Sequence, residues 1–187
     1  MDPAPSLITH LLTLARLESE ATAQENARID LNRLIQDVSE DAEFEAQSHN
    51  RKVRVVRSEQ CFINGNEHLL RSAIENVVRN AVRYTAEGSE VEITLDCRGD
   101  GDNEEAVIGV QDQGAGVPQA ALSSIFLPFY RVADARDRTS GGTGLGLAIS
   151  QRAVRLHGGT ITASNAPGGG LLVEIALPIN PGEAKIR

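Results

Sequence analysis

Apolar residues recur every three or four positions in four stretches of the chain, as they do on the buried face of an amphipathic helix. This pattern predicts helices over residues 6–15, 31–46, 67–84 and 145–157. Asp30 and Asn66 stand directly before the second and third of these, where a side-chain oxygen can accept hydrogen bonds from the first turn. Gly158, followed by a second glycine, is a stop signal for the fourth.

Apolar and polar residues alternate in several other stretches, which is the pattern of β-strands with one buried face. It predicts strands over residues 53–56, 61–63, 90–97, 105–112, 160–164 and 171–177. Asn64 and Gly65 form a turn signal before the helix that begins at Glu67. Helices grouped against these strands predict an α/β fold, a two-layer α/β sandwich with a mixed, mostly antiparallel sheet.

The first predicted helix differs from the others because its apolar stripe is narrow. Leu7, Leu11 and Leu14 form a seam that needs a partner helix, and the polar stretch 18–28 after it has no core face. We interpret residues 1–28 as the end of a coiled-coil or bundle helix with its linker. A helix docked on its own domain is the alternative.

The length of 187 residues corresponds to about one domain with an appendage. We assign residues 29–180 to a single globular domain and residues 181–187 to a tail. The formal charge of −8 argues against nonspecific binding to nucleic acid or to an anionic membrane. The sequence contains no signal peptide and no apolar run of membrane-spanning length.

Two cysteines, Cys61 and Cys97, fall in strand-like stretches and lack the spacing of metal ligands. We expect them to be small buried apolar residues with free thiols, in a reducing compartment.

Two glycine motifs suggest places where the main chain approaches a ligand. The first, residues 112–116, follows a strand on which Ile108, Val110 and Asp112 share the apolar face, so the carboxylate of Asp112 needs a partner. The second, residues 141–147, opens a predicted helix whose first backbone N–H groups form an anion site. A buried acceptor beside a phosphate site indicates a nucleotide.

Positive charge accompanies these motifs in an otherwise acidic chain. The arginines in or between them are Arg79, Arg83, Arg131, Arg136 and Arg138. They suggest a local pocket for a polyanion, although solvated surface positions remain the alternative for Arg79 and Arg136.

Asn76 and Asn80 lie four residues apart and therefore share one face of the predicted helix 67–84. Asparagine is a mediocre helix former, so two on one face suggest a ligand rather than helix propensity. Amide oxygens suit Mg²⁺ where phosphates supply most of the negative charge.

The order and spacing of four motifs is specific. They are Asn76-x3-Asn80, Asp112-x-Gly114-x-Gly116, Phe126-x-Pro128-Phe129 and Gly142-x-Gly144-x-Gly146. Residues 29–177 resemble the catalytic ATP-binding domain of sensor histidine kinases, whose Bergerat fold is shared with DNA gyrase and MutL, and the motifs look like that family's N, G1, F and G2 boxes. Within the family, residues 126–149 are most similar to kinases that respond to envelope stress, and the leading helix resembles the end of the second dimerisation helix.

The resemblance implies that Asp112 accepts a hydrogen bond from the amino group of adenine, while Gly114 and Gly116 let the backbone pass the base. It implies that Asn80 ligates Mg²⁺ with help from Asn76.

It further implies that Arg83 and Tyr84 contact phosphate or ribose. Residues 132–141 would be the mobile lid over ATP, with Arg131 or Arg138 reaching the phosphates. The backbone N–H groups facing the phosphates would be those of Gly142, Thr143, Gly144, Leu145 and Gly146. Phe126 and Phe129 have core packing as their alternative role, Phe126 most of all.

The chain departs from the family in two ways. The phosphoacceptor histidine has no match, since none of His10, His49, His68 and His157 stands in the family's motif, so this chain is not expected to autophosphorylate alone. ATPases of the same superfamily carry a glutamate at the position of Asn76, and asparagine cannot take a proton from water. Glu75 lies about 100° around the helix and is a poor substitute.

The main hypothesis is therefore a kinase catalytic domain that binds Mg·ATP and transfers the γ-phosphate to a histidine on a separate dimerisation domain. A response regulator would be the downstream partner, and the whole protein would be a homodimer anchored in the inner membrane with this part in the cytoplasm. Nucleic acid and direct membrane contact are not expected. The alternatives are an ATP-sensing interaction module without phosphotransfer and a serine kinase of the anti-sigma type.

Overall fold

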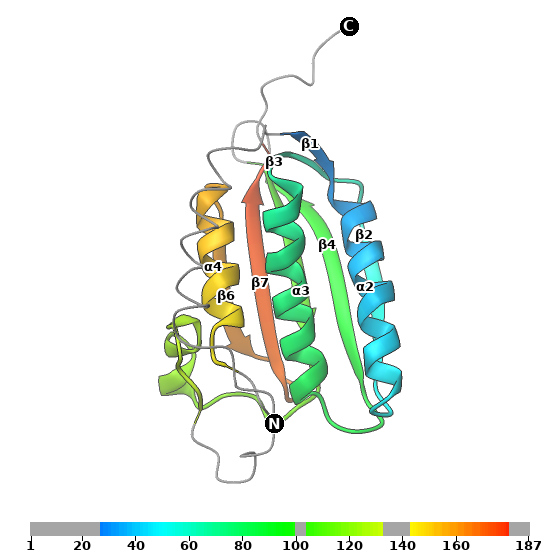
Figure 1. The fold of residues 1–187 in the computed structure, drawn as a ribbon, viewed down its shortest axis with the longest axis vertical. Helices are drawn as coiled ribbons and strands as arrows, with labels where there is room; N and C mark the ends of the chain where they lie inside the picture. Colours follow the sequence, from blue (N-terminus) through cyan, green and yellow to red (C-terminus); the bar gives the residue numbers. More distant parts are fainter. Residues whose placement is uncertain (1–26, 100–103, 133–142, 180–187) are drawn as a thin grey trace, which may run out of the picture.

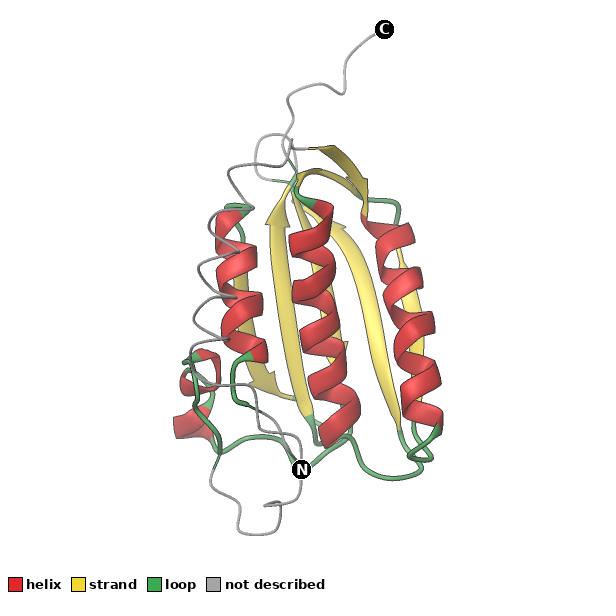
Figure 2. Ribbon diagram, viewed as in Figure 1, coloured by secondary structure: helices red, strands yellow, loops and turns green. Residues whose placement is uncertain are grey.

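The computed structural model describes residues 27–99, 104–132 and 143–179. Its main sheet has the strand order β2-β4-β5-β7-β6, with β2 and β4 parallel and the other neighbours antiparallel. The strands are β2 (Lys52–Ser58), β4 (Glu90–Arg98), β5 (Glu105–Gln111), β6 (Thr160–Asn165) and β7 (Leu171–Pro178). Three helices lie side by side on one face of this sheet (Figures 1 and 2). The predicted two-layer α/β sandwich with a mostly antiparallel sheet is confirmed.

The three α-helices of the described part are α2 (Leu31–Gln47), α3 (Glu67–Tyr84) and α4 (Gly146–Leu156). The predicted caps are present, since Asp30 accepts a hydrogen bond from the backbone of Arg33 and Asn66 accepts one from Leu69. Helix α4 ends at Leu156, shortly before the predicted stop signal Gly158, which has a φ of +72° that favours glycine.

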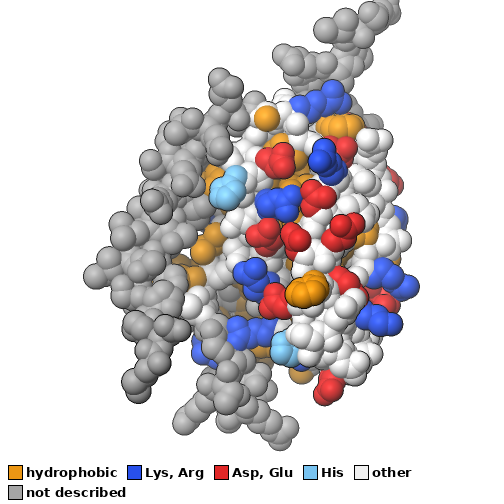
Figure 3. Space-filling view, turned by 45° about the vertical axis from the view of Figure 1, so that its right-hand side comes forward, with side chains coloured by type: hydrophobic (Ala, Val, Ile, Leu, Met, Phe, Trp, Pro, Cys, Tyr) orange, Lys and Arg blue, Asp and Glu red, His pale blue; other side chains and the backbone are white. Residues whose placement is uncertain are grey.

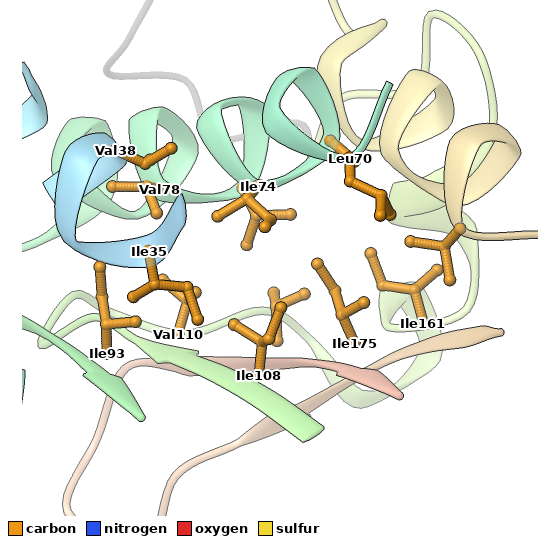
Figure 4. Close-up of a cluster of buried hydrophobic side chains, with 14 of the residues drawn as sticks. Ile35, Val38, Leu70, Ile74, Val78, Ile93, Ile108, Val110, Ile161 and Ile175 are labelled. Atoms are coloured by element: carbon orange, nitrogen blue, oxygen red, sulfur yellow. The ribbon is translucent and has the colours of Figure 1, made fainter. Parts of the chain in front are cut away.

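The core between helices and sheet is almost wholly aliphatic. In Figure 4 the side chains of α2 and α3 point toward those of the strands across this layer. Five of the labelled isoleucines are no more than 1% exposed: Ile35, Ile74, Ile93, Ile108 and Ile175. Each such side chain contributes about 1.5–3 kcal/mol on burial, so an aliphatic core suffices without tryptophan.

A second, two-stranded sheet was not predicted. β1 (Ala27–Asp30) pairs antiparallel with β3 (Phe62–Gly65). The prediction of a turn at Asn64 and Gly65 is wrong, because both residues belong to β3. The imidazole of His157 packs where a side chain at Gly65 would lie, so this glycine serves close packing within a strand.

The prediction of free thiols is also wrong, because Cys61 and Cys97 form a disulfide. Parallel pairing places Ser58 of β2 beside Leu95 of β4, and the chain after β2 therefore runs along the end of β4. The backbone N–H of Cys97 donates to the carboxylate of Glu59 there, which fixes the approach. This register brings together two cysteines that are 36 residues apart in the sequence.

Acidic and basic side chains are interspersed on the face seen in Figure 3. Arg71 of α3 pairs with Asp37 of α2 at 3.1 Å, and Arg79 of α3 lies 3.7 Å from Glu45 of α2. For Arg79, the structure therefore supports a solvated surface position and not a place in a polyanion pocket. Among the described residues, no helix is long and apolar enough to cross a bilayer.

Candidate functional site

Asp112 follows β5 directly and is buried beside the first residue of β7. Its side chain is 3% exposed in the whole molecule. One carboxylate oxygen, Oδ1, accepts hydrogen bonds from the backbone N–H of Gly114 at 2.8 Å and of Leu171 at 3.2 Å. Burial raises the pKa of Asp112 above its ordinary value of 3.8, and these two hydrogen bonds oppose the rise.

The second carboxylate oxygen of Asp112 is left for another donor. Both hydrogen bonds that the side chain accepts end on Oδ1. In the described part of the chain, Nε of Arg51 is the one fully buried side-chain nitrogen or oxygen without a hydrogen-bond partner. Oδ2 of Asp112 is not such an atom and therefore still reaches accessible space. A carboxylate oxygen held rigidly in this way can accept from an exocyclic amino group and rejects an acceptor at the same place.

The first glycine motif is packed tightly by the protein itself. A side chain at Gly114 would run into the carbonyl of Tyr84 at the end of α3, and one at Gly170 would run into the carbonyl of Asp112. Gly116 has a φ of +70°. The glycines therefore allow the loop to lie between α3 and the β6–β7 turn, in addition to any approach to a ligand.

Sequence analysis missed Thr85, which also holds this loop. Thr85 is 1% exposed, and its hydroxyl accepts from the backbone N–H of Gln113 at 3.0 Å. The guanidinium of Arg51 donates to the carbonyls of Val82 and Arg83, which would otherwise end α3 without partners. Because these contacts join segments distant in the sequence, no local pattern could have indicated them.

The predicted metal-binding face of α3 lies against the start of α4. Oδ1 of Asn76 is 3.4 Å from the point where a Cβ at Gly146 would stand, and Asn80 is half-buried one turn along the same face. The hydroxyl of Ser150 donates to the carbonyl of Ala73 at 2.8 Å and ties the two helices together. The described residues hold no group of three or more His, Cys, Asp or Glu that could bind a metal. A cation at the asparagines would need phosphate oxygens to complete its ligands, which suits Mg²⁺.

Helix α4 begins differently from the other two. Its N-terminus at Leu145 has no side-chain cap, whereas Asp30 and Asn66 cap α2 and α3. Gly144 has a φ of +71°, and its carbonyl accepts from the N–H of Phe129, which itself has a φ of +64°. The first N–H groups of α4 are thus presented without a side-chain acceptor, as an anion site requires.

The remaining predicted residues lie near these elements or outside the described residues. Phe126 is 6% exposed and packs in the core, as its alternative role predicted, while Phe129 is 46% exposed. The guanidinium of Arg83 lies 5.9 Å from the centre of the Tyr84 ring, and Thr143 and Arg131 are exposed. Outside the described residues fall the leading helix, lid residues 133–141, Arg138 and Gly142.

Both ring nitrogens of His157 lie within hydrogen-bonding distance of backbone groups. Its Nε2 accepts from the backbone N–H of Asn66 at 2.9 Å, and its Nδ1 lies 2.7 Å from the carbonyl of Ala153. With both ring nitrogens engaged, this imidazole joins the end of α4 to the cap of α3 and does not present a nucleophile.

Known proteins similar to this chain identify its family. Residues 65–181 match the family described as histidine kinase-, DNA gyrase B- and HSP90-like ATPase. The chain is 40% identical over 174 residues to the sensor histidine kinase RppB of Synechocystis sp., and 39% identical over 175 residues to the sensor histidine kinase CpxA of Escherichia coli. These matches cover 92% and 93% of this chain. CpxA is the envelope-stress kinase that residues 126–149 resemble.

A solved structure described as full-length ShkA in complex with AMPPNP is similar in fold. It superposes with a TM-score of 0.77 over 97% of this chain and 37% of that chain, at 28% identity. The present chain likewise spans 37% of the length of RppB and of CpxA. The chain therefore belongs to the histidine kinase-, DNA gyrase B- and HSP90-like ATPases, and it carries the catalytic domain of a sensor histidine kinase.

Proposed function

We propose that this domain binds Mg·ATP and donates the γ-phosphate to a histidine on a separate dimerisation domain. The observation that carries the proposal is the geometry of Asp112, whose Oδ1 is held by two backbone N–H groups while Oδ2 remains available. Adenine offers an amino group to such an acceptor, whereas guanine has a carbonyl at that position. Gly114 and Gly116 bring the main chain beside the base.

The start of α4 supports binding of the phosphates. The N–H groups of Gly144, Leu145 and Gly146 lie at a helix N-terminus without a side-chain cap, and those of Gly142 and Thr143 precede them. Asn76 and Asn80 would hold Mg²⁺ through their amide oxygens beside these phosphates. The ion would supply charge neutralisation for phosphoryl transfer.

The remaining polar groups assist at the edges of this site. Arg83 and Tyr84 stand at the end of α3 for contact with ribose or phosphate. Arg131 and Arg138 are the candidates for stabilising the transferred phosphoryl group from the lid, residues 132–141.

The site favours transfer to a protein side chain over hydrolysis. Asn76 stands where a general base would be needed to activate water. Glu75, its acidic neighbour, points to Arg71 on the outer side of α3, with 3.8 Å between the charged atoms. The acceptor histidine would come from another domain, because none of His10, His49, His68 and His157 stands in the family's phosphoacceptor motif. His157 is in addition hydrogen-bonded within the fold through both ring nitrogens.

We further propose that the whole protein is a sensor kinase, as its relatives are described. The resemblance to sensor histidine kinases implies that it is dimeric, has a membrane anchor and has a response regulator as its downstream partner. Residues 1–28 would be the end of the dimerisation helix and its linker.

The test is transfer of labelled phosphate. The chain is mixed with a dimerisation domain from a related sensor kinase and with ATP labelled in its γ-phosphate. Acid-labile label on the histidine of the dimerisation domain is expected, and Asn80→Ala should abolish it while Arg79→Ala, on the outer face of the same helix, should not. ATP binding without any transfer would instead favour the ATP-sensing interaction module, and acid-stable label on a serine would favour the serine kinase.

A further inference from the structure

Asn165, the last residue of β6, makes an unusual pair of contacts with the loop that follows Asp112. Its Oδ1 accepts from the backbone N–H of Val117 at 2.9 Å, and its Nδ2 donates to the backbone carbonyl of the same residue at 2.7 Å. One side chain thus makes both hydrogen bonds that a neighbouring strand would make with one residue. Only one orientation of the amide satisfies both bonds, so the contact is directional.

The same amide also touches the first glycine motif. A Cβ at Gly116 would lie 2.6 Å from Oδ1 of Asn165, and the φ of Gly116 is +70°. The loop therefore approaches Asn165 closely because position 116 has no side chain.

The loop has four points of attachment along its length. Asp112 is held by Leu171, Gln113 by Thr85, Gly114 by Oδ1 of Asp112, and Val117 by Asn165. The first three fix the beginning of the loop. Among the side chains of the described residues, Asn165 is the one that holds Val117, where the loop leaves the site.

We infer that Asn165 is a positioning residue for the adenine pocket, which it serves by holding Val117 and thereby the backbone of Gly114 and Gly116 in the conformation that receives the base. The inference rests on the proposed function, because the pocket is the one assigned there to adenine. Both ends of the Asn165 amide are engaged by Val117, so its role would be to position the loop and not to bind the nucleotide.

Loss of the two hydrogen bonds between Asn165 and Val117 should reduce the fraction of molecules whose loop is in the binding conformation. The apparent Kd for the nucleotide should rise in proportion. Two exposed hydrogen bonds of ordinary strength correspond to a weakening of Mg·ATP binding of roughly tenfold in Asn165→Ala. Asn165→Asp keeps the shape and the acceptor but sets a carboxylate oxygen against the carbonyl of Val117. It should therefore bind at least as weakly as Asn165→Ala.

The experiment titrates Mg·ATP into the whole chain by calorimetry for wild type, Asn165→Ala, Asn165→Asp and the control Ser164→Ala, an exposed neighbour on the same strand. A raised Kd at unchanged stoichiometry is expected for both Asn165 variants, whereas an irreversibly misfolded fraction would lower the stoichiometry at an unchanged Kd. Denaturation without nucleotide checks that both variants are fully folded under the conditions of the titration. Hydrogen exchange without nucleotide should be faster at the amide of Val117 in the Asn165 variants and unchanged in the control.

Normal Kd values in both Asn165 variants would overturn the inference and leave the proposed function standing, and so would a normal Kd in Asn165→Asp alone. No binding by wild type would instead overturn the proposed function, and the positioning role would fall with it.

Discussion

At the Asp112 end of the site, main chain and side chains are hydrogen-bonded to one another, whereas at the start of α4 the backbone donors have no side-chain cap. Asp112, Thr85 and Asn165 each bond to backbone groups of the first glycine motif or the residue that follows it. We call this region the adenine end. The N-terminus of α4, with the second glycine motif before it, is the phosphate end.

The difference separates two tasks. A base is recognised by a few donors and acceptors at fixed positions, so its pocket must be rigid before the ligand arrives. Phosphates are bound by many N–H groups and a cation, so their site must leave those donors unpaired. Changes at the adenine end should therefore alter which nucleotide binds, and changes at the phosphate end should alter how tightly any nucleotide binds.

Reduction of the disulfide between Cys61 and Cys97 should produce the largest change in the free energy of unfolding. It should not alter the difference between the adenine end and the phosphate end. The bond closes a loop of 36 residues, which corresponds to about 4 kcal/mol of unfolding free energy. Chemical denaturation with and without a dithiol reductant measures the change, and Cys61→Ser with Cys97→Ser is the matched variant. Well below its melting temperature, the reduced protein should keep its preference for ATP over GTP.

Asp112→Asn should give the next largest effect, on binding. Losing a hydrogen bond to a charged acceptor weakens ATP binding by about 2 kcal/mol. The asparagine also offers a donor, so the preference for ATP over GTP should fall. Calorimetric titration with both nucleotides measures this. Asp96→Asn, at the second buried aspartate of the residues that the structure describes, should leave the preference unchanged.

The same variant should be more stable than wild type in the absence of nucleotide. Burial raises the pKa of Asp112, so the folded chain holds the proton more tightly than the unfolded chain. The stability from this group is fully present below the ordinary pKa of 3.8 and is lost as pH rises through the raised pKa. Chemical denaturation at neutral pH should give a larger free energy of unfolding for Asp112→Asn than for wild type. The two free energies should become equal toward acid pH. A variant less stable at neutral pH would contradict the assignment of burial as the main cause.

The sequence predicted the elements that depend on local pattern. The periodicity of residues 67–84 predicts α3 with its observed bounds, and Asn66 and Asp30 are caps because their side chains bond within three residues. The two glycine motifs could be found because they are contiguous.

Contacts between distant segments could not be predicted in this way. Cys61 meets Cys97 because of the register between β2 and β4, and Asn165 meets Val117 across 48 residues of sequence. Asn64 and Gly65 have the composition of a turn, yet pairing with β1 makes them a strand. In each case a tertiary contact decides the structure and leaves no trace in the neighbouring residues.

Ser150→Ala should give the smallest effect and should act on the phosphate end alone. The variant loses the hydrogen bond from α4 to the carbonyl of Ala73, which corresponds to about 1 kcal/mol of unfolding free energy. ATP and GTP affinities should fall together, without a change in their ratio. Denaturation and titration measure both quantities, with Ser72→Ala on α3 as the control. A change in the ratio would mean that the two ends are coupled.

Thermal unfolding of the wild-type chain with Mg·ATP and with Mg·GTP tests the adenine assignment most directly. At about a hundred times its Kd a ligand stabilises the folded state by about 2.7 kcal/mol, which raises the Tm of a domain of this size by roughly 5 to 10 °C. We predict such a rise with Mg·ATP and none with Mg·GTP. Equal shifts with both nucleotides, or no shift with either, would contradict the assignment of Asp112 as the acceptor that selects adenine.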